Sequence, residues 1–569
     1  MNFRRIKHFL RRLFSRRKDR EINPDEIFLD ASNLPAFDQH QFEGRLERPI
    51  AKRTHFLVAA VFLFLLLLYA GRVGFLQTYR GEAFARLSES NRLTHSIIFA
   101  DRGVLYDRTG KELAWNVAGT DDDFALRRYY RDEGLSHAIG YVGYPLKDVA
   151  GVYYQNAYIG RGGAESFFDG RLSGDNGLKI VEIDALQKVT SESVVRPPRD
   201  GENITLSVDA SLSSALFTLL KRRAEESGFV GGAGVVVDIS NGEIIALASY
   251  PEYDSQTLTD GESGERIQSY VEDSRKPFLN RIVSGLYTPG SIIKPIIAIG
   301  ALEEGVITPE KEILSTGSIR VPHPYIEDAF SIFVDWKAHG YVDMRRALAV
   351  SSNVYFYEVG GGFENQKGIG IEGINRYARM FGLGETSSSP FEGESIGVIP
   401  NPRWKEETFN GDEWRIGDTY NTSIGQYGFQ VTPMQMALAI GAIANGGTLF
   451  TPILEKGTSA EKKVLPINAR NTEVVREGMR LGVREGTAQA LSVSFVDVAA
   501  KTGTAELGTV KQFVNSWVVG FYPYENPRYA FAVIMERGPV KNLVGAASVM
   551  REYLEWIHAH APEYLSPVN

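Results

Sequence analysis

Three short strings of this sequence carry side chains that could together perform nucleophilic chemistry. The first is Ser291-Ile-Ile-Lys294, which follows the turn-forming Thr288-Pro-Gly290 and precedes an apolar run from Pro295 to Leu302. Residues i and i+3 share one face of a helix, so we expect Lys294 to reach the hydroxyl of Ser291. A serine hydroxyl needs a base to become a nucleophile, and a partly desolvated lysine can serve. This string predicts a serine nucleophile at the first turn of a helix, where exposed amides favour a developing oxyanion.

The second string is Ser351-Ser352-Asn353, which lies between the amphipathic segment Val342 to Val350 and the apolar segment Val354 to Tyr357. A helix interrupted at this point would leave a hydroxyl and an amide pointing into a cleft. A helix cap is the alternative interpretation, because Ser and Asn favour cap positions.

The third string is Lys501-Thr502-Gly503-Thr504, on a predicted strand that begins Val498-Ala-Ala500. Lys501 and Thr502 offer a cation and a hydroxyl to a carboxylate, and Thr504 offers a backbone N–H. Gly503 would let a ligand backbone lie close to the strand. A glycine-bearing edge strand that binds nothing is the alternative.

The surrounding elements predict an α+β fold. Residues 234–238 and 243–248 flank Asn241-Gly242, a strong hairpin signal because both turn positions tolerate positive φ. Strands are also expected at 204–208, 514–520 and 529–535, and helices at 210–227 and from Leu543 to about His558. A further helix is expected over 432–441, with Thr432 as its N-cap, Pro433 at its first position and a close at Asn445-Gly-Gly447. Strands therefore open and close the region from residue 201 to 569, with mainly helical material between them. We expect one antiparallel sheet to collect both ends of this region.

Residues 78–200 are expected to form an irregular, mostly β module, because they are rich in Gly, Tyr, charge and turn signals. The length of 569 residues is itself about four times the ~150-residue prior for one domain. Acidic residues (70) outnumber basic ones (62), so there is no overall signature of nucleic-acid binding. The chain has 0 Cys, which excludes disulfides, thiolate metal sites and cysteine nucleophiles.

A membrane anchor is expected at residues 54–77. The uncharged run from Phe56 to Ala70, with its flanks, approaches the about 20 residues that cross a bilayer, provided that Arg72 snorkels. A cleaved secretory signal is disfavoured because the leader is too long. Residues 1–53 carry 13 Lys and Arg against 8 Asp and Glu, which predicts a cytoplasmic basic tail. The first twenty residues of that tail suit either a helix on the inner leaflet or a solvated segment.

Taken together and in this order, Ser-x-x-Lys, Ser-x-Asn and Lys-Thr-Gly resemble the signature of penicillin-binding proteins and serine β-lactamases. The resemblance extends to residues 78–200. There the segment from Arg102 to Gly110 is similar to the motif that opens the elongated, non-catalytic pedestal domain of class B penicillin-binding proteins. Residues 162–165 and 177–184 are similar to later pedestal segments, and residues 414–426 and 431–435 are typical of elongation-type members.

This resemblance implies a transpeptidase domain at 201–569 that cross-links the stem pentapeptides of peptidoglycan. Ser291 would be the nucleophile and Lys294 the base, while Ser351 and Asn353 would relay protons and hold the acyl amide. Lys501, Thr502, Gly503 and Thr504 would bind the carboxylate of the substrate or of a β-lactam. The backbone N–H groups of Ser291 and Thr504 would form the oxyanion hole. No cofactor is implied.

Three features depart from the family pattern. Some elongation-type members carry a metal site that includes cysteine, which this chain lacks. A zinc site could in principle be built from residues in a comparable stretch, but their spacing is irregular and we predict none: His323, Asp328, Asp335 and His339. Asn353 stands where some elongation-type members have Asp, and Tyr427 stands where many members have Gly.

The expected protein is a single-pass protein of the bacterial cell membrane, with a cytoplasmic N-terminus and an extracytoplasmic catalytic domain. The roughly 120 residues before the catalytic domain are too few for a glycan polymerase. The resemblance therefore implies a separate glycosyltransferase partner of the SEDS family. Two alternatives stay open: a septal, division-type transpeptidase, or a non-catalytic scaffold or β-lactam sensor of the same fold.

Overall fold

The computed structural model describes residues 51–85, 93–119, 123–183, 189–261, 263–323, 326, 328–508, 512–542 and 544–566. These residues fall into two compact units, Met1–Asn91 and Arg92–Asn569, which are described separately. Almost all of the predicted basic tail lies outside the described residues.

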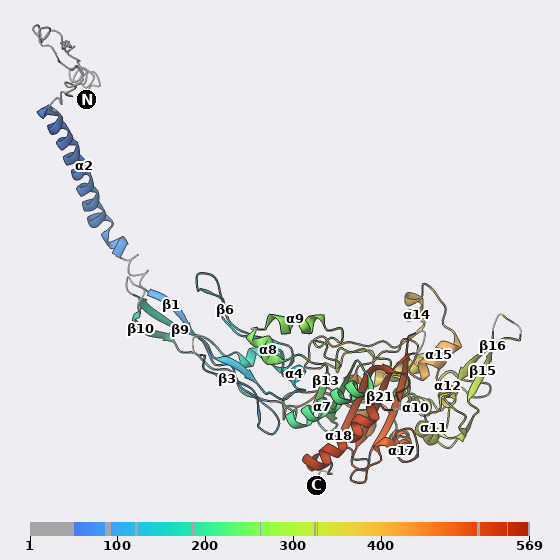
Figure 1. Ribbon diagram of the computed structural model, residues 1–569. Helices are drawn as coiled ribbons and strands as arrows, with labels where there is room; N and C mark the ends of the chain where they lie inside the picture. The colour runs from blue at the N-terminus through green and yellow to red at the C-terminus, as the bar shows by residue number, and fades with distance from the viewer. Residues whose placement is uncertain are drawn as a thin grey trace, which may run out of the picture. The chain divides into compact units, whose positions relative to one another are not determined.

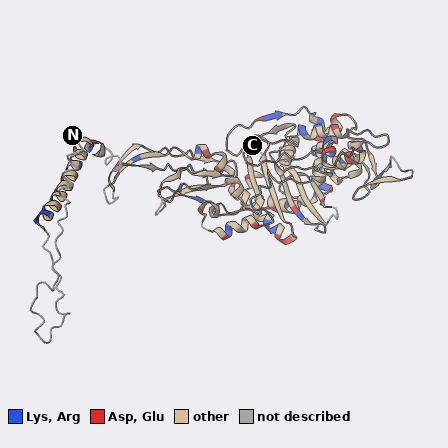
Figure 2. Cartoon of the chain, turned by 90° about the horizontal axis from the view of Figure 1, so that it is seen from above, with Lys and Arg blue, Asp and Glu red and all other residues tan. Residues whose placement is uncertain are grey.

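The described part of the first unit is dominated by one helix, α2 (Lys52–Tyr79), whose side chains are exposed throughout. It has 28 residues and a mean hydropathy of 2.4 in its most apolar window, so it is long and apolar enough to cross a membrane. Figure 2 shows it tan along most of its length, with basic residues toward its two ends. No described residue of its unit buries this apolar helix, which agrees with the predicted anchor.

The pedestal is built from short strands, as predicted, and lies at the narrow end of the second unit (Figure 1). One sheet has the order β1 (Leu93–Ile98), β9 (Gly177–Ile183), β10 (Val189–Arg196). A second sheet has the order β11 (Ile204–Thr205), β2 (Leu105–Tyr106), β3 (Glu112–Val117), β4 (Leu126–Tyr129). The remaining elements are α4 (Ser136–Ile139), β5 (Tyr141–Gly143), β6 (Leu146–Lys147), β7 (Tyr153–Gln155), β8 (Ile159–Arg161), α5 (Gly163–Phe167) and α6 (Asp169–Leu172).

A buried charge cluster holds the pedestal together. The Glu165 carboxylate is 0% exposed and accepts hydrogen bonds from Arg102 Nε at 2.6 Å and from Arg127 Nε at 2.9 Å. Burial alone would favour the neutral acid, but the two guanidinium groups lower the pKa of Glu165 below its usual value. The motif segments that began at Arg102 and included Glu165 therefore serve the architecture of the pedestal.

The predicted strand at 204–208 is shorter than expected and pairs outside the catalytic sheet. Ile204 and Thr205 form β11, which runs parallel to β2 and completes the pedestal sheet. Asp209 follows at once and caps α7 (Ala210–Ser227), where its side chain accepts hydrogen bonds from the N–H groups of Ser211 and Leu212. The chain thus passes from the last strand of this sheet into the helix α7 within a few residues.

The catalytic domain has the predicted antiparallel sheet, which collects both ends of the region. Its order is β13 (Ile244–Tyr250), β12 (Gly231–Asp238), β22 (Tyr529–Pro539), β21 (Phe513–Tyr522), β20 (Ala499–Leu507). The hairpin at Asn241-Gly242 joins β12 to β13, with Gly242 at φ 84°. The strand β20, which carries the third string, lies at the edge of the sheet.

The two faces of this sheet bury different helices. Val235 and Val237 of β12 belong to the core that includes α16 (Pro433–Ala444), whereas Val236 packs into the core that includes α7. Successive side chains of a strand point to opposite faces, so the all-buried β12 needs helices on both sides. The helix α18 (Ala546–His560) lies beside α7 and begins three residues after the predicted start (Figure 1).

The material between the ends of the sheet is mainly helical, as expected. Its helices are η4 (Gly290–Ile293), α10 (Lys294–Glu303), α11 (Met344–Val350), α12 (Asn353–Gly361), α13 (Gly370–Met380), α14 (Pro402–Thr408), α15 (Ile416–Ser423) and α17 (Ala469–Glu485). Short strand pairs join them: β14 (Ile313–Ser315) with β17 (Gly340–Val342), β15 (Ser318–Pro322) with β16 (Phe330–Val334), and β18 (Thr448–Phe450) with β19 (Lys462–Val464).

Candidate active site

Ser291 lies in the 3-10 turn η4, directly before the buried helix α10, as the sequence predicted. Gly290 precedes it at φ 56°, and its N–H donates to the carbonyl of Gly425 at 2.9 Å. A Cβ at position 290 would lie 3.0 Å from the carbonyl oxygen of Thr504. The turn that carries Ser291 is therefore packed between the 425–428 loop and the edge strand β20.

Lys294 is the centre of the hydrogen-bonded network. Its side chain is fully buried, and its Nζ donates to the Ser351 carbonyl at 2.8 Å and to Asn353 Oδ1 at 2.7 Å. The Oγ of Ser351 lies 3.3 Å from the same Nζ. These contacts join the first and second strings. Among the described residues, the Ser291 hydroxyl itself makes no hydrogen bond, so it stays available to a ligand.

Ser351 lies at the junction of two helices, where the sequence predicted a polar interruption. It follows α11 and has φ 58°, a left-handed conformation that costs a non-glycine residue about 1–3 kcal/mol. Ser352 then caps α12, and its side chain accepts a hydrogen bond from the N–H of Tyr355. The cap interpretation is therefore correct for Ser352, while the catalytic role of the adjacent Ser351 stays a prediction.

The third string meets the second through Lys501. Its Nζ donates to Ser351 Oγ at 2.8 Å and to the Thr502 carbonyl at 2.9 Å, and its side chain is 1% exposed. The ammonium group is thus buried against Ser351, while the Thr502 side chain is half-buried. The role of Lys501 toward a carboxylate stays a prediction.

Both active-site lysines have depressed pKa values. Burial lowers the pKa of Lys294 to about 7, and the opposing attraction of Asp335 is smaller. Burial, reinforced by the nearby charge of Lys294, lowers the pKa of Lys501 well below its usual value. A neutral amine is thereby accessible near neutral pH, as a general base requires.

Gly503 is required by the packing of the protein itself. A Cβ at this position would lie 2.9 Å from both the Pro289 carbonyl oxygen and Ile292 Cγ2. The glycine is therefore required so that η4 can press against β20. The close neighbour is the nucleophile turn of the protein itself.

Two functional neighbours were missed or misread from the sequence. Asp335, considered above as a zinc ligand, is buried and accepts hydrogen bonds from Ser352 Oγ at 2.8 Å and from the Val354 N–H at 3.0 Å. It therefore fixes the start of α12. Thr487 was not singled out, and its hydroxyl lies 2.7 Å from that of Thr502. Both contacts join residues that are 15 or 17 positions apart in the chain, with other elements between them, so no spacing in the sequence indicates them.

The stretch considered for zinc does not bring four ligands together. His339 Nε2 lies 3.7 Å from Asp335 Oδ1, while the second carboxylate oxygen of Asp335 is engaged by α12. Within the described ranges, no group of three or more His, Asp or Glu side chains is close enough to hold a metal ion.

Tyr427 occupies the position where many resembling proteins have Gly, and its backbone explains why. Its φ is 61°, and Gly425 and Gly428 beside it also have positive φ. The Tyr427 ring stacks on Phe409 with centroids 6.1 Å apart and lies edge-on to Trp404 at 5.7 Å. Aromatic packing therefore holds a side chain in a conformation that normally selects glycine.

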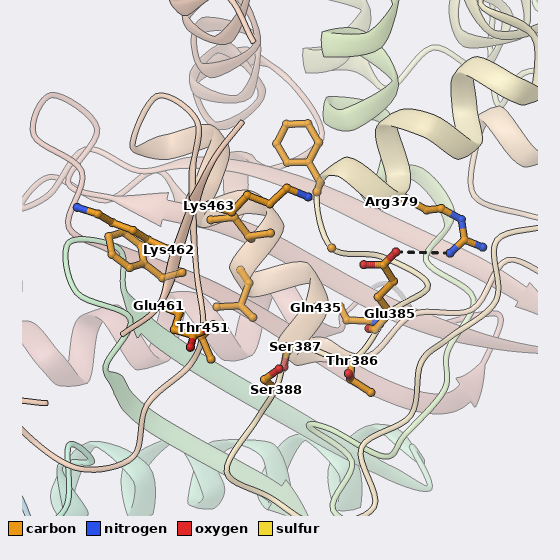
Figure 3. A pocket seen from close by; sticks show the side chains of 15 residues that line it. Arg379, Glu385, Thr386, Ser387, Ser388, Gln435, Thr451, Glu461, Lys462 and Lys463 are labelled. Atoms are coloured by element: carbon orange, nitrogen blue, oxygen red, sulfur yellow. Dashed lines mark hydrogen bonds and ion pairs between the residues drawn. The ribbon is translucent and has the colours of Figure 1, made fainter. Parts of the chain in front are cut away.

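A pocket of about 230 Å³ lies apart from all of these residues. It is lined by the end of α13, residues 385–388, α16, β18 and β19. Figure 3 shows Arg379 facing Glu385 at its rim. The ion pair between these two side chains has an N–O distance of 3.8 Å. Its rim mixes cations, carboxylates and hydroxyls, and it contains none of the predicted site residues.

Comparisons with known proteins agree with this geometry. Residues 232–555 match the family model of the penicillin-binding protein transpeptidase domain, and residues 122–206 match that of the penicillin-binding protein dimerisation domain. The peptidoglycan D,D-transpeptidase MrdA of Acinetobacter baumannii is 30% identical over 491 residues, which are 80% of this chain and 70% of that protein.

Two solved structures are similar over most of the chain. One is a complex between penicillin-binding protein PBP2 and MreC from Helicobacter pylori, with a TM-score of 0.69, 26% identity, and coverage of 83% of this chain and 100% of that one. The other is a peptidoglycan synthase complex described as coordinating polymerization and crosslinking, with a TM-score of 0.68, 26% identity, and coverage of 89% and 98%.

Proposed function

The chain belongs to the penicillin-binding protein transpeptidase family, and we propose that it is a peptidoglycan D,D-transpeptidase acting through a serine acyl-enzyme during cell-wall elongation. One observation supports this most strongly. Lys294 and Lys501, from distant parts of the chain, both contact the hydroxyl of Ser351, directly beside the turn that carries Ser291.

In the first half-reaction, Ser291 Oγ attacks the carbonyl carbon of the penultimate D-Ala of a stem pentapeptide. The neutral amine of Lys294 takes the hydroxyl proton as the C–O bond forms. The N–H groups of Ser291 and Thr504 stabilise the oxyanion. When the C–N bond breaks, the proton passes through the Ser351 hydroxyl to the departing amine, and terminal D-Ala leaves.

In the second half-reaction, an amine of a neighbouring stem peptide attacks the ester carbonyl of the acyl-enzyme. A new amide bond forms and the Ser291 C–O bond breaks. The attacking amine gives up one proton to the Lys294–Ser351 network, and the network passes a proton to the departing Ser291 oxygen. Asn353 is suited to hold the acyl amide because its Oδ1 already bonds Lys294 and its side-chain N–H groups remain as donors.

β-Lactams mimic the D-Ala-D-Ala end, so the same attack should leave a stable acyl group on Ser291. The test is the intact mass of the full-length protein in detergent after incubation with benzylpenicillin. We expect one adduct on the parent and on Ser269→Ala, a surface control in α9 (Gly264–Glu272), and none on Ser291→Ala. Rapid turnover of the drug would indicate a hydrolase, and a folded parent without adduct would refute the proposal.

The elongation role has a separate test. Cells depleted of an elongation enzyme round up, whereas cells depleted of a division enzyme form filaments. Complementation by Ser291→Ala separates catalysis from scaffolding, because a scaffold or sensor should support growth without its nucleophile. Rounded cells that only the parent rescues would support the role proposed here.

The proposed topology places the N-terminus in the cytoplasm and the catalytic domain outside. It is supported by Lys52 and Arg53 at the start of α2 and by the basic residues before them. The chain has 0 Cys, so single cysteines can be labelled without background. An impermeant maleimide should label Ser193→Cys in intact cells, and should label Ser32→Cys only after lysis. The reverse pattern would overturn the topology.

A glycan polymerase of the SEDS family is the proposed partner. Neither matched family model describes a polymerase, and one similar structure is a synthase complex described as coordinating polymerization and crosslinking. If the anchor carries the contact, replacing residues 54–77 with an unrelated membrane helix should abolish copurification with the polymerase while acylation by benzylpenicillin continues. Unchanged copurification would place the contact elsewhere.

A further inference from the structure

Thr487 lies at the accessible edge of the active site but belongs to none of the three strings. It follows α17, and its hydroxyl oxygen lies 2.7 Å from that of Thr502 on β20. Its N–H donates to the carbonyl of Ala349 at 3.0 Å, and Ala349 lies on α11, two residues before Ser351. Thr487 therefore bridges the elements that carry the second and third strings.

The position of Thr487 is closely fixed by its neighbour Gly486. A Cβ on Gly486 would lie 2.0 Å from the carbonyl oxygen of Ala349, so the turn can approach α11 only because residue 486 has no side chain. The turn thus holds the Thr487 hydroxyl beside Thr502, and the Thr487 side chain remains exposed.

The hydrogen-bonding capacity of the pair matches a carboxylate. Each hydroxyl has one proton and can also accept, so one proton of the pair is used between Thr487 and Thr502 and the other stays free. In the structure Thr502 donates to Thr487, so the free proton is that of Thr487. A carboxylate has two acceptor oxygens and no proton, so it takes one hydrogen bond from each hydroxyl once the Thr502 hydroxyl rotates away from Thr487. Lys501 lies behind the pair with its ammonium buried, which leaves the hydroxyls as the accessible donors.

We propose that Thr487 is a second hydroxyl of the carboxylate subsite and donates, beside Thr502, to the free carboxylate of the terminal D-Ala or of a β-lactam. This assignment rests on the proposed transpeptidase function. It makes Thr487 a substrate-binding residue, in contrast to a residue that only orients Thr502.

The test compares a ligand that has the carboxylate with one that lacks its charge. The rate constant for acylation of the full-length protein is measured with benzylpenicillin and with its methyl ester. We expect Thr487→Val to slow acylation by benzylpenicillin about tenfold, the effect of losing one hydrogen bond to a charged group. Thr487→Ser should restore the rate, and the methyl ester should react equally with the parent and with Thr487→Val.

Thr458→Val, which alters an exposed threonine outside the site, is the matched control, and thermal unfolding checks that each variant is folded. An equal loss for both ligands would mean that Thr487 only supports the site, and would overturn the assignment. An unchanged rate with benzylpenicillin would overturn it as well. A parent that benzylpenicillin does not acylate at all would instead refute the transpeptidase function itself, so the two failures are distinguishable.

Discussion

The Nζ of Lys501 lies 2.8 Å from the Oγ of Ser351, although 150 positions separate them in the chain. The same Oγ lies 3.3 Å from the Nζ of Lys294. The Ser351 hydroxyl therefore contacts two buried amines with depressed pKa values. Either amine can accept a proton from this hydroxyl. A network of this kind can pass a proton from the attacking serine to the leaving amine without bulk water.

Removal of the proposed base should abolish most acylation. We expect Lys294→Met to lower the rate constant for acylation by benzylpenicillin by about 10²–10⁴-fold, the range typical of a lost general base. Lys462→Met, which alters an exposed lysine on β19, should react like the parent. Intact-mass spectrometry of samples quenched at successive times gives both rate constants. If Lys294→Met reacts as fast as the parent, Lys294 is not the base, and Lys501 becomes the candidate.

Acylation should rise with pH across neutrality. Below its pKa of about 7 Lys294 is protonated and cannot accept the Ser291 proton, so the acid limb of the profile should have its midpoint near that value. Asp335 favours the charged form of Lys294, and Asp335→Asn should therefore move the midpoint to lower pH, by up to about one unit.

Asp343→Asn is the control for that shift. Asp343 caps α11 through the N–H of Arg346, much as Asp335 holds the start of α12, but it does not contribute to the pKa of Lys294. We expect a comparable loss of stability and an unmoved midpoint. Equal shifts in the two variants would show that helix capping, and not charge, sets the profile.

The contact between β20 and η4 predicts an effect of position 503. Gly503→Ala should destabilise the protein by about 1–3 kcal/mol, the cost of overpacking, because its methyl group must displace Pro289 or Ile292. The displaced turn carries Ser291, so acylation should fall at least about tenfold. Gly264→Ala is the control, because a Cβ at position 264 has no neighbour within 4 Å. This variant should lower neither the stability of the protein nor its acylation rate. Urea unfolding and acylation rates check both.

At Tyr427 a strained backbone conformation lowers the stability of the protein, and aromatic packing of the side chain raises it. Tyr427→Gly removes a left-handed strain of about 1–3 kcal/mol but also removes contacts with Phe409, Trp404 and Trp414, each worth about 0.5–1.5 kcal/mol beyond the lost burial. We expect a net loss of about 1–2 kcal/mol for Tyr427→Gly and little change for Tyr427→Phe. A more stable glycine variant in urea unfolding would show that strain dominates.

Local signals predicted many of the elements well. The helix Ala210–Ser227 begins and ends where its periodicity indicated, and Asn241-Gly242 forms the expected hairpin. These signals depend on interactions between residues that are close in the chain, so they can be recognised from the sequence. The strand predicted at 204–208 was less accurate, because its partner β2 lies about a hundred positions earlier in the chain.

The sequence by itself determined the chemical inventory: a serine with a lysine three positions later, a Ser-x-Asn string, a Lys-Thr-Gly strand and an apolar anchor segment. The tertiary structure decided what each of them touches. In the structure Asp335 binds the start of α12, and Thr487 lies beside Thr502. Lys501 is buried against Ser351, and Gly503 packs against the turn that carries Ser291. These pairings depend on how helices and strands pack across long loops, and residue spacing carries no record of that packing.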